Sequence, residues 1–273
     1  MTIDREAPIG VFDSGVGGLT VACEIMQNLP KERIVYFGDT ARVPYGSKSR
    51  ETVLRYSRQI VRFLQTQGVK AIVVACNTAS ALALDEIEKE IDIPIIGVIK
   101  SGARVAAATT KDDKVGVIAT ESTIQSGMYQ DYIRKIDASI EVFGKACPLF
   151  VPLVEEGWME DSITNQVIER YLSVFARQQI DTLILGCTHY PLLSKNIKAV
   201  MGKGVELVNP AYETAIELGG LLKRLDIEST IKETGEFPYR FFVSDAANKF
   251  THFANSILPV AAPVTQQINI EEY

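Results

Sequence analysis

Two cysteines, Cys76 and Cys187, stand where an active side chain is expected in this sequence. Each follows a short apolar run typical of a buried strand, and polar residues at the expected start of a helix come next. The N-terminus of a helix lowers the pKa of a thiol and so favours the reactive thiolate. A free cysteine is also often a small buried apolar residue, and this alternative stays open for either cysteine taken alone.

Two thiols on opposite sides of one ligand suit the inversion of a stereocentre. A proton must leave one face of a carbon atom and another must arrive on the opposite face, so one group begins as thiolate and the other as thiol. The remaining cysteines, Cys23 and Cys147, lack this setting, and we expect structural roles for them. Because no two cysteines form a CxxC pair, free thiols are expected, and neither a disulfide framework nor a redox pair.

Three further side chains near expected strand ends could carry protons. Asp13 could accept a proton, orient the ammonium group of a ligand or the thiol of Cys76, or simply cap a helix. His189 is either a proton partner for Cys187 or a histidine hydrogen-bonded at a helix start. Glu155 follows an apolar run and is either an acid with a shifted pKa at a cleft or an exposed residue at a strand end.

Other kinds of site have weaker support. The loop 39–46, Asp-Thr-Ala-Arg-Val-Pro-Tyr-Gly, follows an expected strand and could contact a ligand or be a simple turn. With two histidines in the chain and no cluster of cysteines, we expect no metal site. The turn 15–18 lacks the GxGxxG spacing and has no phosphate-binding lysine, which argues against a nucleotide site.

Alternating strand and helix patterns must position these residues. Apolar residues recur at helical spacing over 53–64 and 163–175. Between such stretches lie short apolar runs rich in valine and isoleucine, as in parallel strands covered on both faces. An α/β fold with mostly parallel sheets is therefore predicted. Its strands are expected at Ile9–Phe12, Ile34–Phe37, Ala71–Ala75, Ile95–Val98, Val115–Ala119, Ile140–Phe143, Thr182–Leu185, Glu206–Val208 and Tyr239–Val243.

The chain also resembles itself. Residues 71–78 match residues 182–189 at an offset of 111, which places Cys76 opposite Cys187. Residues 9–14 match 115–120, and 95–98 match 205–208, at similar offsets. We infer two similar parallel-sheet α/β domains related by pseudo-twofold symmetry, with the active site in the cleft between them. The predicted division is 1–99 plus 211–258 for the first domain, 100–210 for the second, and 259–273 for a loose C-terminal tail.

The composition is that of a globular protein, with 47% hydrophobic and 23% charged residues among 273. The net charge is −6 and the basic residues are scattered, which argues against a nucleic-acid or membrane-surface partner held by charge. The charged start has no apolar segment typical of a signal peptide, and no apolar run is long enough to span a membrane. We therefore expect a cytoplasmic protein.

Four motifs in order resemble the glutamate racemase family of the aspartate/glutamate racemase superfamily. The match extends over almost the whole chain, from Ile9 to Phe250. The motifs are Phe12-Asp13-Ser14-Gly15-Val16-Gly17-Gly18-Leu19, Gly38-Asp39-Thr40-Ala41-Arg42-Val43-Pro44-Tyr45-Gly46, Ala75-Cys76-Asn77-Thr78-Ala79 and Leu185-Gly186-Cys187-Thr188-His189-Tyr190-Pro191.

The resemblance implies a cofactor-independent interconversion of L- and D-glutamate, which supplies D-glutamate for bacterial peptidoglycan, and a homodimeric enzyme. It implies that Cys76 and Cys187 are the two acid/base groups. Asp13 would assist on the Cys76 side, His189 on the Cys187 side, and Glu155 would be a further assisting acid. The residues that would hold the substrate are Asp13, Ser14, Tyr45, Gly46, Asn77, Thr78, Thr120, Thr188 and His189.

The sequence departs from the family pattern in three places. Asn209-Pro210 stands where relatives often have Asp-Ser, and Glu121 stands where a small residue is more usual. The segment after Pro259 has no clear counterpart. A racemase for aspartate or another amino acid stays an alternative, as does a two-lobed binding protein without catalytic activity.

Overall fold

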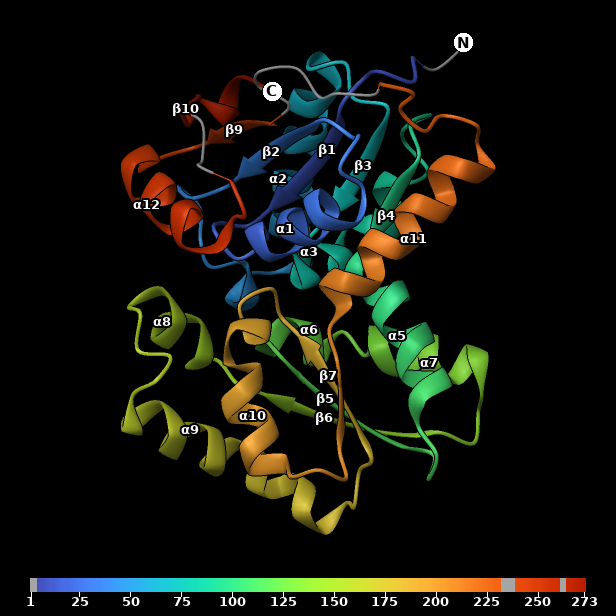
Figure 1. The fold of residues 1–273 in the computed structure, drawn as a ribbon, viewed down its shortest axis with the longest axis vertical. Helices are drawn as coiled ribbons and strands as arrows, with labels where there is room; N and C mark the ends of the chain where they lie inside the picture. The colour runs from blue at the N-terminus through green and yellow to red at the C-terminus, as the bar shows by residue number, and fades with distance from the viewer. Residues whose placement is uncertain (1–3, 232–238, 261–263) are drawn as a thin grey trace.

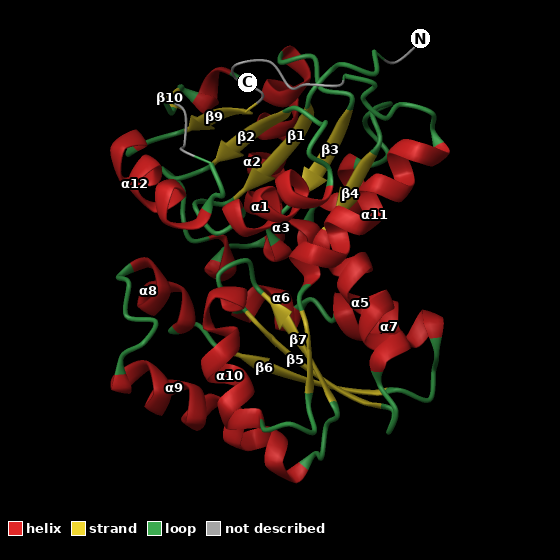
Figure 2. Cartoon of the chain, viewed as in Figure 1, coloured by secondary structure: helices red, strands yellow, loops and turns green. Residues whose placement is uncertain are grey.

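The computed structural model describes residues 4–231, 239–260 and 264–273, and it has two parts that lie one above the other (Figure 1). Each part is built on its own sheet (Figure 2). The first sheet has six strands in the order β10-β9-β2-β1-β3-β4, and the second has four in the order β6-β5-β7-β8. The described strands pair in parallel throughout. The predicted fold of two parallel-sheet α/β domains is therefore confirmed.

The elements follow the expected alternation. The strands are β1 (Ile9–Asp13), β2 (Ile34–Gly38), β3 (Ala71–Val74), β4 (Ile95–Gly97), β5 (Lys114–Ala119), β6 (Glu141–Ala146), β7 (Thr182–Gly186), β8 (Glu206–Val208), β9 (Tyr239–Val243) and β10 (Gln266–Gln267). The α-helices are α1 (Leu19–Asn28), α2 (Arg50–Thr66), α3 (Asn77–Leu82), α4 (Leu84–Ile87), α5 (Val98–Thr109), α6 (Glu121–Gln125), α7 (Met128–Ile136), α8 (Phe150–Glu155), α9 (Ser162–Leu172), α10 (Ser194–Met201), α11 (Pro210–Arg224) and α12 (Ala247–Ile257). Short 3₁₀ helices are η1 (Tyr45–Ser47), η2 (Ser173–Arg177), η3 (Tyr190–Leu193) and η4 (Ile270–Glu272).

The internal repeat of the sequence corresponds to a repeated strand order. The order β2-β1-β3-β4 in the first sheet recurs as β6-β5-β7-β8 in the second. Ile9 pairs with Ala71 in the first sheet, and Val115 pairs with Thr182 in the second. These are the positions that the repeat matches. The ends of β3 and β7, which precede the two candidate cysteines, are therefore equivalent places in the two parts.

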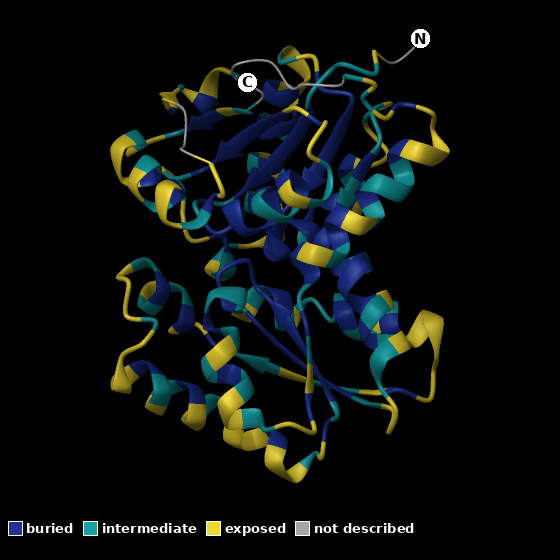
Figure 3. Ribbon diagram, in the orientation of Figure 1, coloured by how far each residue is buried: buried dark blue, intermediate teal, exposed yellow. Residues whose placement is uncertain are grey.

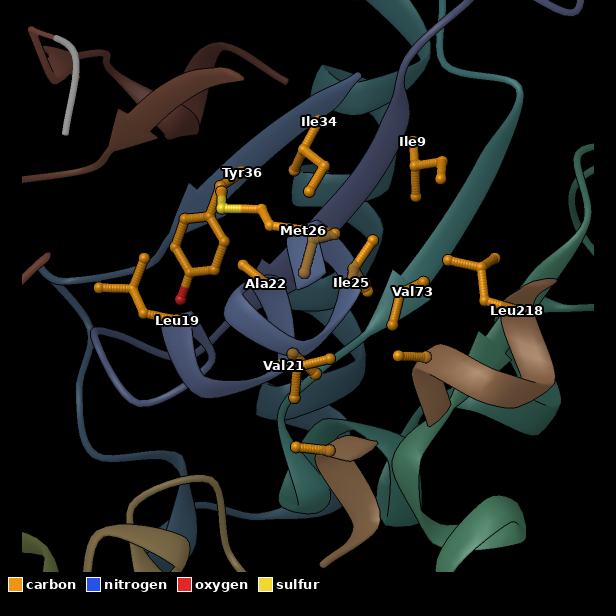
Figure 4. Packing of buried hydrophobic residues seen from close by; sticks show 14 of the residues in the cluster. Ile9, Leu19, Val21, Ala22, Ile25, Met26, Ile34, Tyr36, Val73 and Leu218 are labelled. Carbon is orange, nitrogen blue, oxygen red and sulfur yellow. The ribbon is translucent and has the colours of Figure 1, made fainter. Parts of the chain in front are cut away.

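The first sheet is buried because helices cover both of its faces (Figure 3). Neighbouring residues of β1 show this, since Val11 belongs to the cluster under α1 and α11, whereas Phe12 belongs to the cluster under α2. Figure 4 shows the first cluster from close by. The labelled side chains come from α1, the strands and α11: Ile9, Leu19, Val21, Ala22, Ile25, Met26, Ile34, Tyr36, Val73 and Leu218. This packing fixes the start of α1 at the carboxyl end of the sheet.

Two helices connect the parts: α5 leads from the first sheet to the second, and α11 leads back (Figure 1). They pack against each other, and Ser101 and Arg104 of α5 donate hydrogen bonds to Glu217 of α11 at 2.6 and 3.1 Å. The predicted domain boundaries at 99/100 and 210/211 fall within α5 and in the first turn of α11. A division of the chain at those residues stays a prediction.

The predicted loose tail is wrong for residues 264–273. Residues 266–267 form β10, which pairs with β9 at the edge of the first sheet, and Ile270 is buried. Main-chain pairing and apolar packing therefore fix a segment whose polar residues suggested no structure. Predictions that concern residues 1–3 and 261–263 lie outside the described residues.

All four cysteines are free, as predicted. Cys23 is half-buried on α1, and Cys147 is fully buried just after β6. Among the described helices, none combines the length and the apolar character that crossing a membrane requires.

A buried ion pair lies at the start of β3. The Lys70 ammonium is 2.6 Å from the Glu32 carboxylate and donates a hydrogen bond to the carbonyl of Ile227 at 2.8 Å. Lys70→Ala would leave Glu32 buried without its counter-charge, so we expect the free energy of unfolding to fall by about 3–5 kcal/mol. Urea denaturation measures this loss. Exposed Lys31 is the control, and an equal loss in Lys31→Ala would contradict the explanation.

Candidate active site

A cavity of about 400 Å³ lies between the carboxyl ends of the two sheets. Both parts of the molecule contribute to its wall, so it depends on how they are placed relative to each other. It is lined by Ser14, Gly15, Val43, Pro44, Tyr45, Gly46 and Thr78 from the first part, and by Thr120, Pro148, Val151, Pro152, Glu155, Cys187, Thr188 and His189 from the second. A smaller cavity of about 180 Å³ adjoins it, shares Glu155, and is lined by Lys249 and Phe250 of α12.

Nine of the twelve predicted site residues line the larger cavity. The other three, Asp13, Cys76 and Asn77, are buried beside Ser14 and Thr78, which do line it. The structure thus brings residues from both halves of the sequence to one place. Contact of any of them with a ligand stays a prediction.

A line of three polar side chains runs along one side of the cavity. The Sγ atom of Cys187 lies 3.8 Å from Nδ1 of His189, and Nε2 of His189 lies 3.1 Å from Oε1 of Glu155. Cys187 follows β7, whereas Glu155 is the last residue of helix α8. The alternative of an exposed glutamate at a strand end is therefore wrong, because the run before Glu155 is helical and its carboxylate is engaged.

The contact between His189 and Glu155 shifts the pKa of both side chains. Burial alone lowers the pKa of His189, but its hydrogen bonds with Cys187 and Glu155 outweigh burial and raise this pKa to about 10. The hydrogen bond from His189 holds the pKa of Glu155 below its usual range, against the effect of burial. At neutral pH the imidazole is therefore protonated and the carboxylate is charged.

Cys76 has a different environment. Its Sγ atom accepts a hydrogen bond from the amide of Ala79 at 3.4 Å and donates one to the hydroxyl oxygen of Ser14 at 3.5 Å, and it caps the N-terminus of α3. Burial and the nearby carboxylate of Asp13 nevertheless raise the pKa of Cys76 to about 12. The prediction that a helix N-terminus would favour a thiolate here is wrong, because burial outweighs the two hydrogen bonds.

Asp13 holds the turn after β1. Its Oδ2 atom accepts a hydrogen bond from the amide of Gly15 at 2.9 Å, whereas Oδ1 has no hydrogen-bond partner among the described residues. Burial raises the pKa of Asp13, and the charge of His189 partly opposes this. The residue is not a helix cap, because α1 is preceded by Gly18 and has no side-chain cap. It is therefore a buried carboxyl group with one free oxygen.

The glycine-rich turn brings the two parts close together. A Cβ atom on Gly17 would lie 2.3 Å from Oγ1 of Thr188 and 2.5 Å from the ring of His189. The hydroxyl of Thr20 donates a hydrogen bond across the same contact to the carbonyl of Thr188 at 3.0 Å. Glycine at position 17 is required because the second part occupies the space that a side chain would need.

Hydroxyl groups join the parts on the Cys76 side. Thr78 of the first part lies 3.0 Å from Thr120 and 3.3 Å from Thr123 of the second, oxygen to oxygen. The hydroxyl of Tyr129 donates a hydrogen bond to Oδ1 of Asn77 at 2.7 Å. Thr123 and Tyr129 were missed from sequence, because each lies in a short helix and no local pattern marks either as part of a site.

Two further predictions concern the loop 39–46 and metals. Tyr45 lines the cavity, but its hydroxyl proton is directed at the carboxylate of Asp39. Gly46 packs so closely on Thr120 that a Cβ atom would lie 2.7 Å from its side chain. Over the described ranges, no group of three or more His, Cys, Asp and Glu side chains is arranged to hold a metal ion.

We expect Gly17→Ala to push the two parts away from each other. The added methyl group would overpack a tight contact, at a cost of about 1–3 kcal/mol. Cys187 should then react faster with iodoacetamide, followed at the level of its peptide by mass spectrometry. Gly204 faces open space, so Gly204→Ala should react at the wild-type rate. An unchanged rate in Gly17→Ala would show that the contact does not close the cavity.

The His189–Glu155 pair should make stability depend on alkaline pH. Because hydrogen bonds with Cys187 and Glu155 raise the pKa of His189 from 6.5 to about 10, the protonated imidazole stabilises the fold fully below pH 6.5, and this contribution is lost as the pH rises through about 10. Glu155→Gln should lower the pKa of His189, measured by NMR of the imidazole, and reduce that loss. The exposed Glu156 offers the control Glu156→Gln. An equal pKa in all three proteins would refute the pairing.

Comparisons with known proteins agree with this geometry. The model of the Asp/Glu/Hydantoin racemase family matches residues 21–217. The chain is 48% identical over 263 residues to a glutamate racemase of Geobacter metallireducens, a match that covers 96% of this chain and 97% of the relative.

Solved structures of similar proteins lead to the same family. A glutamate racemase isoform from Bacillus anthracis has a TM-score of 0.91 and 41% identity, over 97% of this chain and 98% of that one. A glutamate racemase from Francisella tularensis in complex with D-glutamate has a TM-score of 0.92 and 40% identity, over 98% and 100% of the two chains. The resemblance predicted from the motifs is confirmed: the chain belongs to the Asp/Glu/hydantoin racemase family, among its glutamate racemases.

Proposed function

We propose that the protein interconverts L- and D-glutamate, with Cys76 and Cys187 as the two acid/base groups. One observation supports this above all: the two thiols follow equivalent strands of two facing sheets, on either side of the region where the cavity lies. Each thiol has its own acidic or basic neighbour, Asp13 near Cys76 and His189 beside Cys187. Two thiols with such surroundings are what proton transfer on opposite faces of Cα requires.

The resting protonation states follow from the surroundings. With a pKa of about 12, Cys76 is a thiol at neutral pH and can donate a proton. The protonated imidazole of His189, 3.8 Å from Cys187, can donate a hydrogen bond to a thiolate there. In one direction, Cys187 thus removes the Cα proton of the substrate and Cys76 delivers a proton to the opposite face. The roles are exchanged in the reverse direction.

Groups around the cavity suit a ligand with two carboxylates and one ammonium group. The hydroxyls of Thr78, Thr120 and Thr188 can donate hydrogen bonds to carboxylate oxygens. Glu155 lines the wall and Asp13 is buried beside Ser14, which also lines it, and these two carboxyl groups favour the ammonium group. In this proposal Ser14 and the loop at Tyr45 and Gly46 complete the substrate site, and Asn77 contributes the amide that Tyr129 orients.

The remaining parts of the proposal concern the cellular setting. We propose that the enzyme acts in the cytoplasm as a homodimer and supplies D-glutamate for peptidoglycan. The likeness to glutamate racemases supports the supply of D-glutamate, and the location and the assembly are proposed from the family resemblance alone. Neither pyridoxal phosphate nor a metal ion takes part in the two-thiol route.

The test is racemisation in D₂O, with a reductant and without added cofactor. L-Glutamate should yield D-glutamate that carries deuterium at Cα, measured by chiral chromatography and mass spectrometry. Removal of a general acid or base costs about 10²–10⁴-fold in rate, so Cys76→Ala and Cys187→Ala should each lose at least that much. Cys23→Ala, the half-buried thiol on α1, is the matched control and should keep the wild-type rate.

Three outcomes would change the proposal. Turnover of L-aspartate alone would keep the mechanism and replace the substrate. Activity that survives in either cysteine variant would refute the two-thiol mechanism. Binding of glutamate without exchange of the Cα proton would favour a binding protein without catalytic activity.

A further inference from the structure

The last residues of the chain contact the loop that forms one wall of the cavity. Glu271 accepts a hydrogen bond from Nη1 of Arg42 at 2.9 Å and another from Nε2 of Gln59 at 3.1 Å. The same Nη1 atom of Arg42 donates to Oε1 of Gln59 at 2.6 Å. Arg42 belongs to the loop 39–46, so a carboxylate from the end of the sequence is bound to a residue close in sequence to the cavity wall.

Arg42 also contacts a buried carboxylate, that of Asp39. Its side chain is 10% exposed and its guanidinium lies over the ring of Tyr56, 4.0 Å from the centroid. The Nε atom is 2.7 and 3.0 Å from the two oxygens of Asp39, whose side chain is 0% exposed. Because Asp39 is buried, it depends on this partner for its position.

Asp39 in turn fixes a residue of the wall. The hydroxyl of Tyr45, itself 1% exposed, donates a hydrogen bond to Asp39, and the hydroxyl of Ser244 donates a second at 2.8 Å. Tyr45 and Gly46 line the cavity. A continuous series of contacts therefore runs from Glu271 through Arg42 and Asp39 to the cavity.

The C-terminal segment is itself held firmly enough to act on the loop. Its β10 strand pairs with β9, and Ile270 is buried in the cluster under α2. Tyr273 packs edge-on against Phe63, with ring centroids 5.3 Å apart, and its carbonyl accepts a hydrogen bond from Arg62 at 2.8 Å. Both contacts come from α2, which also carries Gln59.

We propose that residues 264–273 are a clamp that holds the loop 39–46 in its substrate-binding position, with Glu271 and Arg42 as positioning residues. Neither residue touches the substrate in this arrangement. They raise the fraction of molecules in which Tyr45 and Gly46 line the cavity. The proposal goes beyond the proposed function, and it uses that function only for its kinetic readout.

Glu271→Gln tests the clamp with little risk to the fold. The Glu271 side chain is 63% exposed, and an exposed ion pair contributes little to global stability, so the melting temperature should stay almost unchanged. Amide hydrogen exchange of residues 40–47 should become faster, and the KM for glutamate should rise about threefold with kcat nearly constant, as expected for a weak ion pair. Glu272→Gln is the control, because Glu272 contacts Asn269 and not the loop.

Arg42→Lys tests the next link in the series. Lysine keeps the charge but cannot bind Asp39 and Glu271 together in the geometry of a guanidinium, so KM should rise by about tenfold. In the Arg42→Lys background, Glu271→Gln should have no further effect on KM, since the two residues act in series.

The outcomes separate the clamp from the proposed function. Unchanged amide hydrogen exchange of residues 40–47 in Glu271→Gln would refute the clamp, whether or not the protein racemises glutamate. A lower melting temperature with unchanged KM would show that the contacts only stabilise the fold. Faster loop exchange in a protein that does not racemise glutamate would support the clamp as a structural link and refute the catalytic proposal alone.

Discussion

The site depends on how closely the two sheets approach at their carboxyl ends, and the contact at Gly17 sets that distance. A turn without side chains lets Thr188 and His189 come against the backbone of the first part. Neither part encloses the cavity alone, because each supplies about half of its lining. The hydrogen bond between Thr20 and Thr188 then holds the two surfaces in register.

The two cysteines at equivalent positions of the repeated fold have different chemical surroundings. Cys76 and Cys187 follow strands that occupy the same place in the two sheets. Burial near Asp13 keeps Cys76 protonated, whereas a charged imidazole lies beside Cys187. The difference lies in the neighbouring side chains and in the backbone that follows, which is helix α3 after Cys76 and a turn leading to η3 after Cys187. Two thiols at equivalent strand ends of a repeated fold thus have different electrostatic surroundings.

The fold and the equivalence of the two cysteines could be predicted from sequence because they leave periodic or repeated patterns, whereas most other residues of the candidate site followed from the resemblance to glutamate racemases. Apolar runs marked the strands, and the repeat placed Cys76 opposite Cys187. Contacts between distant segments leave no such pattern: Tyr129 on Asn77 and Glu271 on Arg42 join residues far apart in the chain. The pKa of Cys76 was misjudged for a related reason, since burial is a property of the whole fold and not of a helix start.

The two connecting helices bear on how a ligand reaches the cavity. Both α5 and α11 lie on the same flank of the molecule, bound to each other through Glu217, whereas α8 and α12 face each other on the opposite flank (Figure 1). The chain connections between the parts therefore lie on one flank, where α3 and α7, which carry Asn77 and Tyr129, pack against α5. Rotation of one part about that flank would widen the cavity at Glu155 and α12 more than it would lengthen the hydrogen bond from Tyr129 to Asn77.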